Sequence, residues 1–281
     1  MWWLARRSVI AAYEDGCFGA AKGAAYSALL CFFPLLTVTA TILVQIQAQP
    51  VSRLLSRVLS HAVPPGTEDA VLQSFRVQGE RPASLLIVAT VISLWAASRV
   101  MTSLMEGFQA IYRIPKGRPF LRHQGMAILI VLCTVAPLAL ALTLILFGTR
   151  VEHFAVQRLG VASAGQELQA GVALAAKAAR YAVALGAGIG VAAVLYSLGP
   201  NRPQRWRYVW PGAVAATVLW LASTLAFGWY VRNIADYNVL YGSIGAAIAL
   251  VVWLYVLAAV ALVGCEFNAE YERLHHAFAK P

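Results

Sequence analysis

The chain has 281 residues, of which 60% are apolar and only 12% are charged, and its formal net charge is +10. An ordinary soluble domain is about 45–50% apolar and about 25% charged, so this chain has more apolar surface than a soluble core of its length would hide. The composition excludes an ordinary soluble domain, and because no basic run carries interleaved aromatic residues, the positive charge indicates loops that meet anionic lipid rather than a nucleic-acid partner.

Six apolar segments follow one another along the chain, and a helix needs about 20 such residues to cross the hydrocarbon core of a bilayer. We expect membrane-spanning helices at roughly 23–48, 84–112, 124–149, 178–199, 209–231 and 241–265. The predicted fold is all-α, a polytopic membrane protein whose residues 1–281 form a single integral membrane domain. The sequence contains no recognisable internal repeat and no linker to a second domain.

Two further helices are expected at the membrane interface. In the segment 51–62, apolar residues recur at helical spacing on one face, polar and basic residues take the other, and Pro64 and Pro65 end the pattern. Such an amphipathic helix is typical of a segment that lies in the interface or caps a bundle. Residues 166–180 predict a second helix that leads into the fourth span.

The distribution of Lys and Arg predicts the orientation of the chain. With six spans, twelve Lys and Arg residues fall on the side of the two termini and seven on the opposite side. Cytoplasmic loops carry the excess of basic residues in membrane proteins. We therefore expect both termini in the cytoplasm, with the bilayer itself as partner through anionic lipids at the basic loops.

Proline interrupts two of the spans, at Pro34 in the first and at Pro137 in the third. Each proline removes one backbone hydrogen bond and so bends or opens its helix. One interpretation is a packing kink, and the other is a hinge beside a cavity. Pro34 and Pro137 are therefore candidate hinges.

Ionisable residues gather where the second and sixth spans reach the expected cytoplasmic side. Arg99 should lie about 22 Å past the outer end of its helix, in the inner half of the bilayer, where a charged side chain usually has a partner. We expect this partner to be Glu106 or Glu266. For Glu270 and Glu272 we favour an ordinary helix end that returns to water, and a buried ion pair can be structural rather than a transport site. The candidate cytoplasmic-side polar layer comprises Asp15, Arg99, Glu106, Glu266, Asn268 and Glu270.

Four separated blocks resemble the YihY/BrkB family of bacterial inner-membrane proteins: "AAYSALLCFFPLL", "LWAASRVMTSLMEGFQAIYRI", "LYSLGPNRPQRWRYVWPGA" and "LYGSIGAAIALVVWLYVLAAVALVGCEFNAEYER". The resemblance implies six helices in the bacterial inner membrane and no settled activity, since the family has been labelled both virulence factor and ribonuclease BN. Its usual pair of tyrosines reads Tyr26 and Ser27 here. Its recurrent features fall on Asp15, Tyr26, Pro34, Arg99, Pro200, Pro211, Gly212, Tyr241, Gly242, Gly245, Trp253, Glu266 and Asn268.

Sequence motifs favour transport over catalysis. No HxHxD, HExxH, GxSxG or Gly-rich phosphate loop occurs in the chain, so we expect no enzyme activity, no metal and no cofactor, and a ribonuclease function is not supported. Because a buried charge is costly to retain without a use, we favour a transporter, channel or lipid- or envelope-handling protein of unidentified substrate. The alternative is a non-transporting envelope scaffold, and the oligomeric state is left open.

Overall fold

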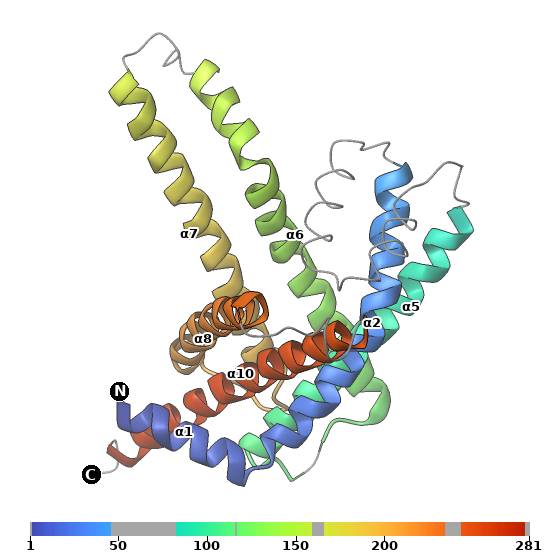
Figure 1. The fold of residues 1–281 in the computed structure, drawn as a ribbon. Helices are drawn as coiled ribbons and strands as arrows, with labels where there is room; N and C mark the ends of the chain where they lie inside the picture. Colours follow the sequence, from blue (N-terminus) through green and yellow to red (C-terminus); the bar gives the residue numbers. More distant parts are fainter. Residues whose placement is uncertain (1, 46–82, 116, 159–165, 234–242, 279–281) are drawn as a thin grey trace.

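A computed structural model describes residues 2–45, 83–115, 117–158, 166–233 and 243–278. Six of the helices in these residues, all except the first, are long and apolar enough to cross a membrane. The predicted all-α fold with six spans is therefore confirmed. The helices are α1 (Trp2–Glu14), α2 (Cys17–Gln45), α5 (Ala83–Ile111), α6 (Phe120–Arg158), α7 (Gln166–Leu198), α8 (Trp206–Asn233) and α10 (Ser243–Phe278) (Figure 1).

Several helices extend beyond the apolar segments that predicted them. α10 continues past the expected end of the sixth span to Phe278, and residues 166–180 form the first part of α7 rather than a separate helix. α1 is an addition to the predicted elements. It is followed by Gly16, whose φ of 71° is the left-handed conformation that favours glycine after a helix end. The amphipathic helix expected at 51–62 lies outside the described residues.

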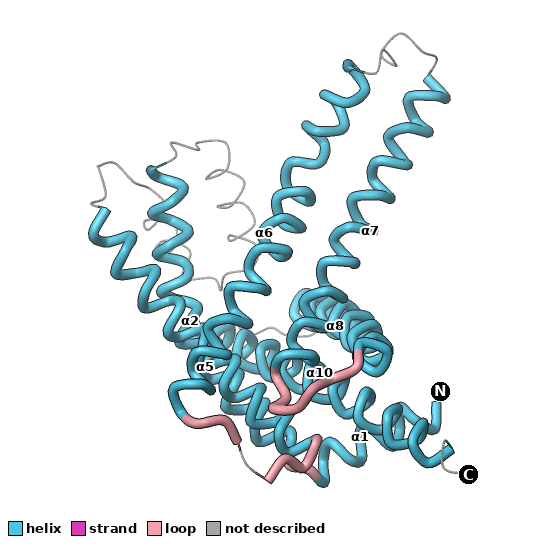
Figure 2. Tube along the Cα trace, turned by 180° about the vertical axis from the view of Figure 1, so that it is seen from behind, coloured by secondary structure: helices cyan, strands magenta, loops and turns pink. Residues whose placement is uncertain are grey.

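Two antiparallel helix pairs rise from a common base. α2 packs on α5 and α6 packs on α7, and the two pairs diverge from each other both in Figure 1 and in the reverse view of Figure 2. α10 crosses this base, where it packs on α1, α2 and α8. The two termini and the α5–α6 and α7–α8 connections lie at the same base, which we call the terminal end.

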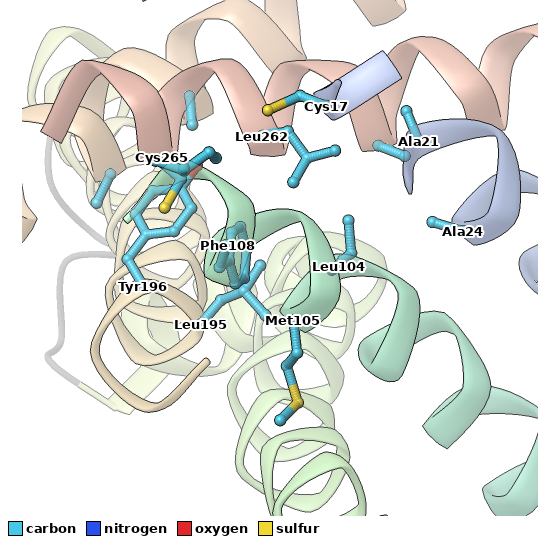
Figure 3. Packing of buried hydrophobic residues seen from close by; sticks show 14 of the residues in the cluster. Cys17, Ala21, Ala24, Leu104, Met105, Phe108, Leu195, Tyr196, Leu262 and Cys265 are labelled. Atoms are coloured by element: carbon cyan, nitrogen blue, oxygen red, sulfur yellow. The ribbon is translucent and has the colours of Figure 1, made fainter. Parts of the chain in front are cut away.

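The core of the terminal end combines a few large side chains with many alanines (Figure 3). Phe108 from α5 and Tyr196 from α7 meet edge to face, with their ring centroids 5.8 Å apart. The hydroxyl of Tyr196 donates a hydrogen bond to the carbonyl of Ala261 in α10, at 2.7 Å. Small residues between these anchors allow the helix backbones to approach closely, which is how helices associate in a membrane.

α8 and α10 cross at a pair of glycines. A methyl group on Gly212 would overlap the carbonyl oxygen of Gly264 and would lie 2.5 Å from the side chain of Asn268. A methyl group on Gly264 would lie 2.6 Å from the Cβ of Ala216. Only glycine at these two positions lets the backbones come this close.

The two candidate hinge prolines lie inside helices that continue past them, Pro34 in α2 and Pro137 in α6. Pro34 lacks the amide hydrogen that would otherwise bond to the carbonyl of Leu30 one turn earlier. A third proline, Pro211, lies inside α8 next to the glycine crossing. Movement at Pro34 or Pro137 stays a prediction.

Candidate functional site

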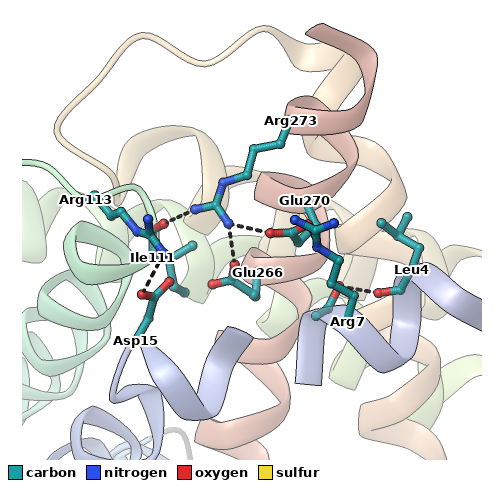
Figure 4. Close-up of polar contacts among 9 residues, drawn as sticks. Leu4, Arg7, Asp15, Ile111, Arg113, Glu266, Glu270 and Arg273 are labelled. Carbon is teal, nitrogen blue, oxygen red and sulfur yellow. Dashed lines mark hydrogen bonds and ion pairs between the residues drawn. The ribbon is translucent and has the colours of Figure 1, made fainter. Parts of the chain in front are cut away.

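Two acidic residues of α10 are buried at the terminal end and share one arginine (Figure 4). Glu266 is 0% exposed and Glu270 is 2% exposed. One guanidinium nitrogen of Arg273, Nη1, lies 2.5 Å from Glu270 Oε1 and 3.2 Å from Glu266 Oε1. The other, Nη2, donates to the carbonyl of Ile111 at the end of α5, at 2.8 Å. Arg273 thus neutralises buried charge and fixes α10 to α5.

Residues from the first part of the chain complete this cluster. Arg7 of α1 reaches Glu270, with 2.6 Å between Arg7 Nε and Glu270 Oε2. Asp15, in the turn between α1 and α2, pairs with Arg113 after α5 at 3.5 Å. We call the whole set the terminal polar cluster, and it comprises Arg7, Asp15, Arg113, Glu266, Glu270 and Arg273.

The terminal polar cluster balances three carboxylates against three guanidinium groups. The carboxylates are the buried members, whereas the arginines reach in from positions that are 37–72% exposed. Three carboxylate oxygens, Asp15 Oδ2, Glu266 Oε2 and Glu270 Oε2, are buried without a hydrogen-bond partner among the described residues, and only the last of them has an ion-pair contact, with Arg7. Buried acids that are held this way lock helices together, because removing one partner strands the other charge.

Asn268 is brought to the same end but has a different partner. Its side-chain amide nitrogen donates to the carbonyl of Val209 at 3.0 Å, and its oxygen accepts from the backbone amide of Gly212 at 2.6 Å. The side chain therefore bonds to the α8 backbone on both sides of Pro211, which has no amide hydrogen of its own. Asn268 holds the α8–α10 crossing and makes no contact with the acids.

The connections at the terminal end are also fixed by arginines. Arg118 donates to the carbonyls of Leu198, Gly199 and Pro200, at 3.0–3.2 Å, and so satisfies carbonyls at the end of α7. A cation is favourable there because the negative end of the helix dipole is close. Burial, together with the nearby Arg122, lowers the pKa of Arg118, although a guanidinium remains charged at physiological pH.

Glu272 does not return to water either. It forms an ion pair with Arg202 of the α7–α8 connection, and the Arg202 guanidinium lies 4.3 Å from the centre of the Tyr112 ring. Burial raises the pKa of the Tyr112 phenol well above its ordinary value, so the ring is neutral and serves as a surface for the cation. The expectation that α10 returns to water at Glu270 and Glu272 is therefore wrong.

The expected pairing of Arg99 with Glu106 or Glu266 is also wrong. Glu266 is already engaged by Arg273. Glu106, two turns further along α5, is exposed and forms no salt bridge within the part of the chain that the structure describes. Among the described residues, Arg99 forms no salt bridge.

One of the three arginines that hold the acids, Arg273, could have been predicted from the sequence. Arg273 follows Glu270 by three residues and Glu266 by seven, a spacing that keeps all three on one face of a helix. Arg7 and Arg113 carried no such signal, because they lie on other elements and meet the cluster only in the folded chain.

Arg99 instead lines a cavity between α2 and α5 that measures about 270 Å³. α2 contributes Tyr26, Ser27 and Leu30, and α5 contributes Trp95, Ala96 and Arg99. The two helices thus use the same spacing of i, i+1 and i+4, with a small residue of each, Ser27 and Ala96, in the middle. Leu30 is also the residue whose carbonyl Pro34 leaves without its helical partner.

Comparisons with known proteins find many relatives, and three of them are as follows. A ribonuclease-like protein named YfkH from Bacillus subtilis (strain 168) is 29% identical over 189 residues, which are 67% of this chain and 66% of that protein. A UPF0761 membrane protein from Alkalilimnicola ehrlichii is 28% identical over 95% of this chain and 58% of its own length. A UPF0761 membrane protein from Chromobacterium violaceum is 28% identical over 87% of this chain and 56% of its own length.

The chain thus spans less than two thirds of the length of each of these relatives. No solved structure gives a significant match. The family described as virulence factor BrkB matches residues 10–280, in agreement with the four sequence blocks that suggested it. Because this match covers nearly the whole chain, the protein belongs to the virulence factor BrkB family.

Proposed function

We propose that this protein is a multi-pass protein of the bacterial inner membrane, with both termini in the cytoplasm, that binds and moves an anionic amphiphile. The observation that carries the proposal is the cavity lined by Arg99. It lies between two membrane-spanning helices, and a charged side chain inside such a segment typically marks the path of a substrate or an ion.

The contrast between Arg99 and the terminal polar cluster supports a binding role. In the terminal polar cluster, arginines neutralise buried acids of the same chain. Arg99 has no such acid among the described residues, and it faces a cavity whose other walls are two aromatic rings, a leucine, an alanine and a serine. A cation on an otherwise mainly apolar wall suits a ligand with one anionic group and an apolar body.

The alternative is a scaffold that packs and recruits partners without transport, and the close-packed terminal end supports it. The cavity also does not include Glu106, so it is not a continuous path of charged residues across the bundle. A nuclease function has less support. Glu266 and Glu270 are engaged by arginines, and among the described residues no three His, Cys, Asp or Glu side chains are placed to hold a metal ion.

Reconstitution into liposomes tests the proposed function. Fluorescent anionic amphiphiles with one or two acyl chains would be placed in both leaflets, and their movement would be followed by chemical quenching from outside. We expect movement that depends on the protein and falls at least about tenfold in Arg99→Gln, because a charge-assisted hydrogen-bonded contact is lost. Arg205→Gln, an exposed arginine away from the cavity, is the matched control. Liposomes that behave the same with and without protein would favour the scaffold.

Labelling of single cysteines tests the orientation. Cys17 and Cys265 are buried, so the experiment needs a cysteine-free background with new cysteines at exposed positions. Gly171→Cys and Arg205→Cys flank α7 at opposite ends. In intact cells we expect a membrane-impermeant reagent to reach position 171 and not position 205. The reverse pattern would overturn the proposed orientation.

A further inference from the structure

We propose that the cavity between α2 and α5 binds the phosphate of an anionic glycerophospholipid through Arg99, and that the acyl chains of this lipid lie along the outer faces of α2 and α5. This inference deepens the proposed function and rests on it, because it names the class of amphiphile that the protein handles. It follows from the charge, the size, the depth and the surroundings of the cavity.

The charge of the cavity fits one phosphate. Arg99 is the one cation among its lining residues. A guanidinium is a planar fork that binds phosphate oxygens in a bidentate manner. The hydroxyl groups of Ser27 and Tyr26 also line the cavity and can donate to the same anion.

The size of the cavity fits a headgroup and excludes a whole lipid. Its volume of about 270 Å³ is at the lower limit of ligand cavities, which run from roughly 300 to 1,000 Å³. The floor is deep enough for a headgroup because Ser27 and Ala96 are small, and Ala96 is 7% exposed. The apolar body of the ligand must therefore lie outside the cavity.

The depth of Arg99 requires a lipid phosphate that is drawn well below the headgroup layer. Arg99 precedes the end of α5 at Ile111 by twelve residues, or about 18 Å of helix. The headgroup layer on each side of a bilayer takes up roughly 5–8 Å of this length. The α5 backbone at Arg99 then lies about 10–13 Å below the headgroup layer. An extended arginine side chain covers part of this distance, and the phosphate has to move inward over the rest.

Two exposed apolar stripes leave the cavity in the direction of the opposite membrane face. On α2 the stripe continues from Tyr26 through Leu30 to Phe33, which are 52–66% exposed. On α5 it continues from Trp95 through Ile92 to Val88, which are 46–63% exposed. Both follow the spacing of three and four residues that keeps side chains on one helix face. They start at the cavity mouth, so a headgroup at Arg99 would place acyl chains on them.

A free inorganic anion fits less well. It would need an aqueous route and further donors, whereas Leu30, Trp95 and Ala96 present mainly carbon atoms to the cavity. A phospholipid carries acyl chains together with its phosphate, and these chains can cover the exposed apolar stripes on α2 and α5. A phospholipid and a free phosphate compound would both bind Arg99 through a phosphate group. The experiment therefore has to compare the two.

Binding to the purified full chain in a non-ionic detergent tests the inference. Native mass spectrometry and thermal unfolding would be measured with phosphatidylglycerol, with phosphatidylcholine, and with glycerol 3-phosphate as the free headgroup. We expect phosphatidylglycerol to bind and to raise the unfolding temperature, glycerol 3-phosphate to do neither, and phosphatidylcholine, whose choline offsets the phosphate charge, to bind at least about tenfold more weakly. Equal protection by glycerol 3-phosphate would overturn the lipid as ligand.

Three variants assign the binding to the cavity. Arg99→Gln should weaken phosphatidylglycerol binding by at least about tenfold, and Arg99→Lys by less, because the charge remains while the bidentate contact is lost. Ser27→Phe should also weaken phosphatidylglycerol binding, because the phenylalanine ring fills the cavity while Arg99 is retained. This variant tests the inference if Arg99→Gln does not fold. Arg205→Gln should bind like wild type. Unchanged binding in both Arg99→Gln and Ser27→Phe would overturn the inference.

The binding and transport experiments fail in different ways. If phosphatidylglycerol binds through Arg99 but no amphiphile moves in liposomes, the assigned ligand stands and the proposed transport does not. If amphiphiles move in liposomes but phosphatidylglycerol does not bind, or binds equally well to Arg99→Gln, the proposed transport stands and the assigned ligand does not.

Discussion

The terminal polar cluster and the Arg99 cavity use the same kind of side chain in opposite ways. In the cluster, three arginines from separate elements meet three carboxylates, and the acids are the buried members. In the cavity, one arginine faces apolar walls and forms no salt bridge within the described residues. Charge that is satisfied inside the chain holds helices together, whereas charge that is left for an outside partner is available for recognition.

The two regions also differ in packing. At the terminal end, glycines and alanines bring the backbones together until Gly212 and Gly264 have no room for a methyl group. Between α2 and α5, the small residues Ser27 and Ala96 line a cavity instead. Small side chains therefore lead to close backbone contact where α8 and α10 cross, whereas Ser27 and Ala96 leave room for a cavity beside Arg99.

The largest effect is expected from breaking the cluster at Arg273. Arg273→Met strands the buried carboxylates of Glu266 and Glu270, and loss of one partner in a buried pair costs about 3–5 kcal/mol. The lower part of this range is expected because the Arg273 side chain is 37% exposed. Titration with SDS in detergent micelles, followed by circular dichroism, measures the free energy of unfolding.

A second variant separates lost charge pairing from lost packing. Neutralising Glu266 and Glu270 as glutamines in the Arg273→Met background should recover part of the lost stability, because no charge is then stranded. Arg205→Met removes an arginine of the same end without a buried partner and serves as the control. An Arg273→Met protein as stable as wild type would show that the cluster does not hold the terminal end.

A smaller effect is expected at the glycine crossing. Gly212→Ala places a methyl group against the Gly264 carbonyl and Asn268, and overpacking of this kind costs roughly 1–3 kcal/mol. Gly190→Ala in α7 is the matched control, because a methyl group there meets nothing within 4 Å and alanine favours the helix. The same unfolding titration measures both. Equal stability of the two variants would contradict the described crossing.

The smallest effect on stability is expected at the cavity. Arg99→Gln and Glu106→Gln should each change the free energy of unfolding by less than about 0.5 kcal/mol in lipid-free detergent, as exposed side chains without a buried partner do. A large loss of unfolding free energy in Arg99→Gln would mean that Arg99 is also part of a structural ion pair. The comparison between the two regions would then fail.

The sequence predicted the spans well, because a run of about 20 uncharged apolar residues has few alternatives to a membrane helix. It did not predict how far α10 continues, since a helix ends where its caps and contacts end rather than where the bilayer does. Asp15, Glu266 and Glu270 were expected in one polar layer, and the structure places them together at the terminal end. Their partners were not predicted: the spacing of Arg273 on α10 was overlooked, and Arg7 and Arg113 meet the acids only when α1, α5 and α10 pack together.

Arg99 shows the limit of this reasoning most clearly. Its depth in the second span follows from counting residues, and helical spacing places it on the same face as Ser103. Spacing along one helix does not say whether that face meets another helix, a cavity or lipid. The neighbour is set by α2, whose Tyr26, Ser27 and Leu30 form the facing wall.

The ion pair between Arg7 and Glu270 joins the first described helix to the last one. Because α10 is synthesised after α1 and the other five spans, Arg7 has no ion-pair partner until Glu270 has been made. A copy whose translation stops before α10 has no carboxylate for Arg7, no amide for the Val209 carbonyl and no guanidinium for the Ile111 carbonyl. The terminal end therefore assembles only after α10 has been made.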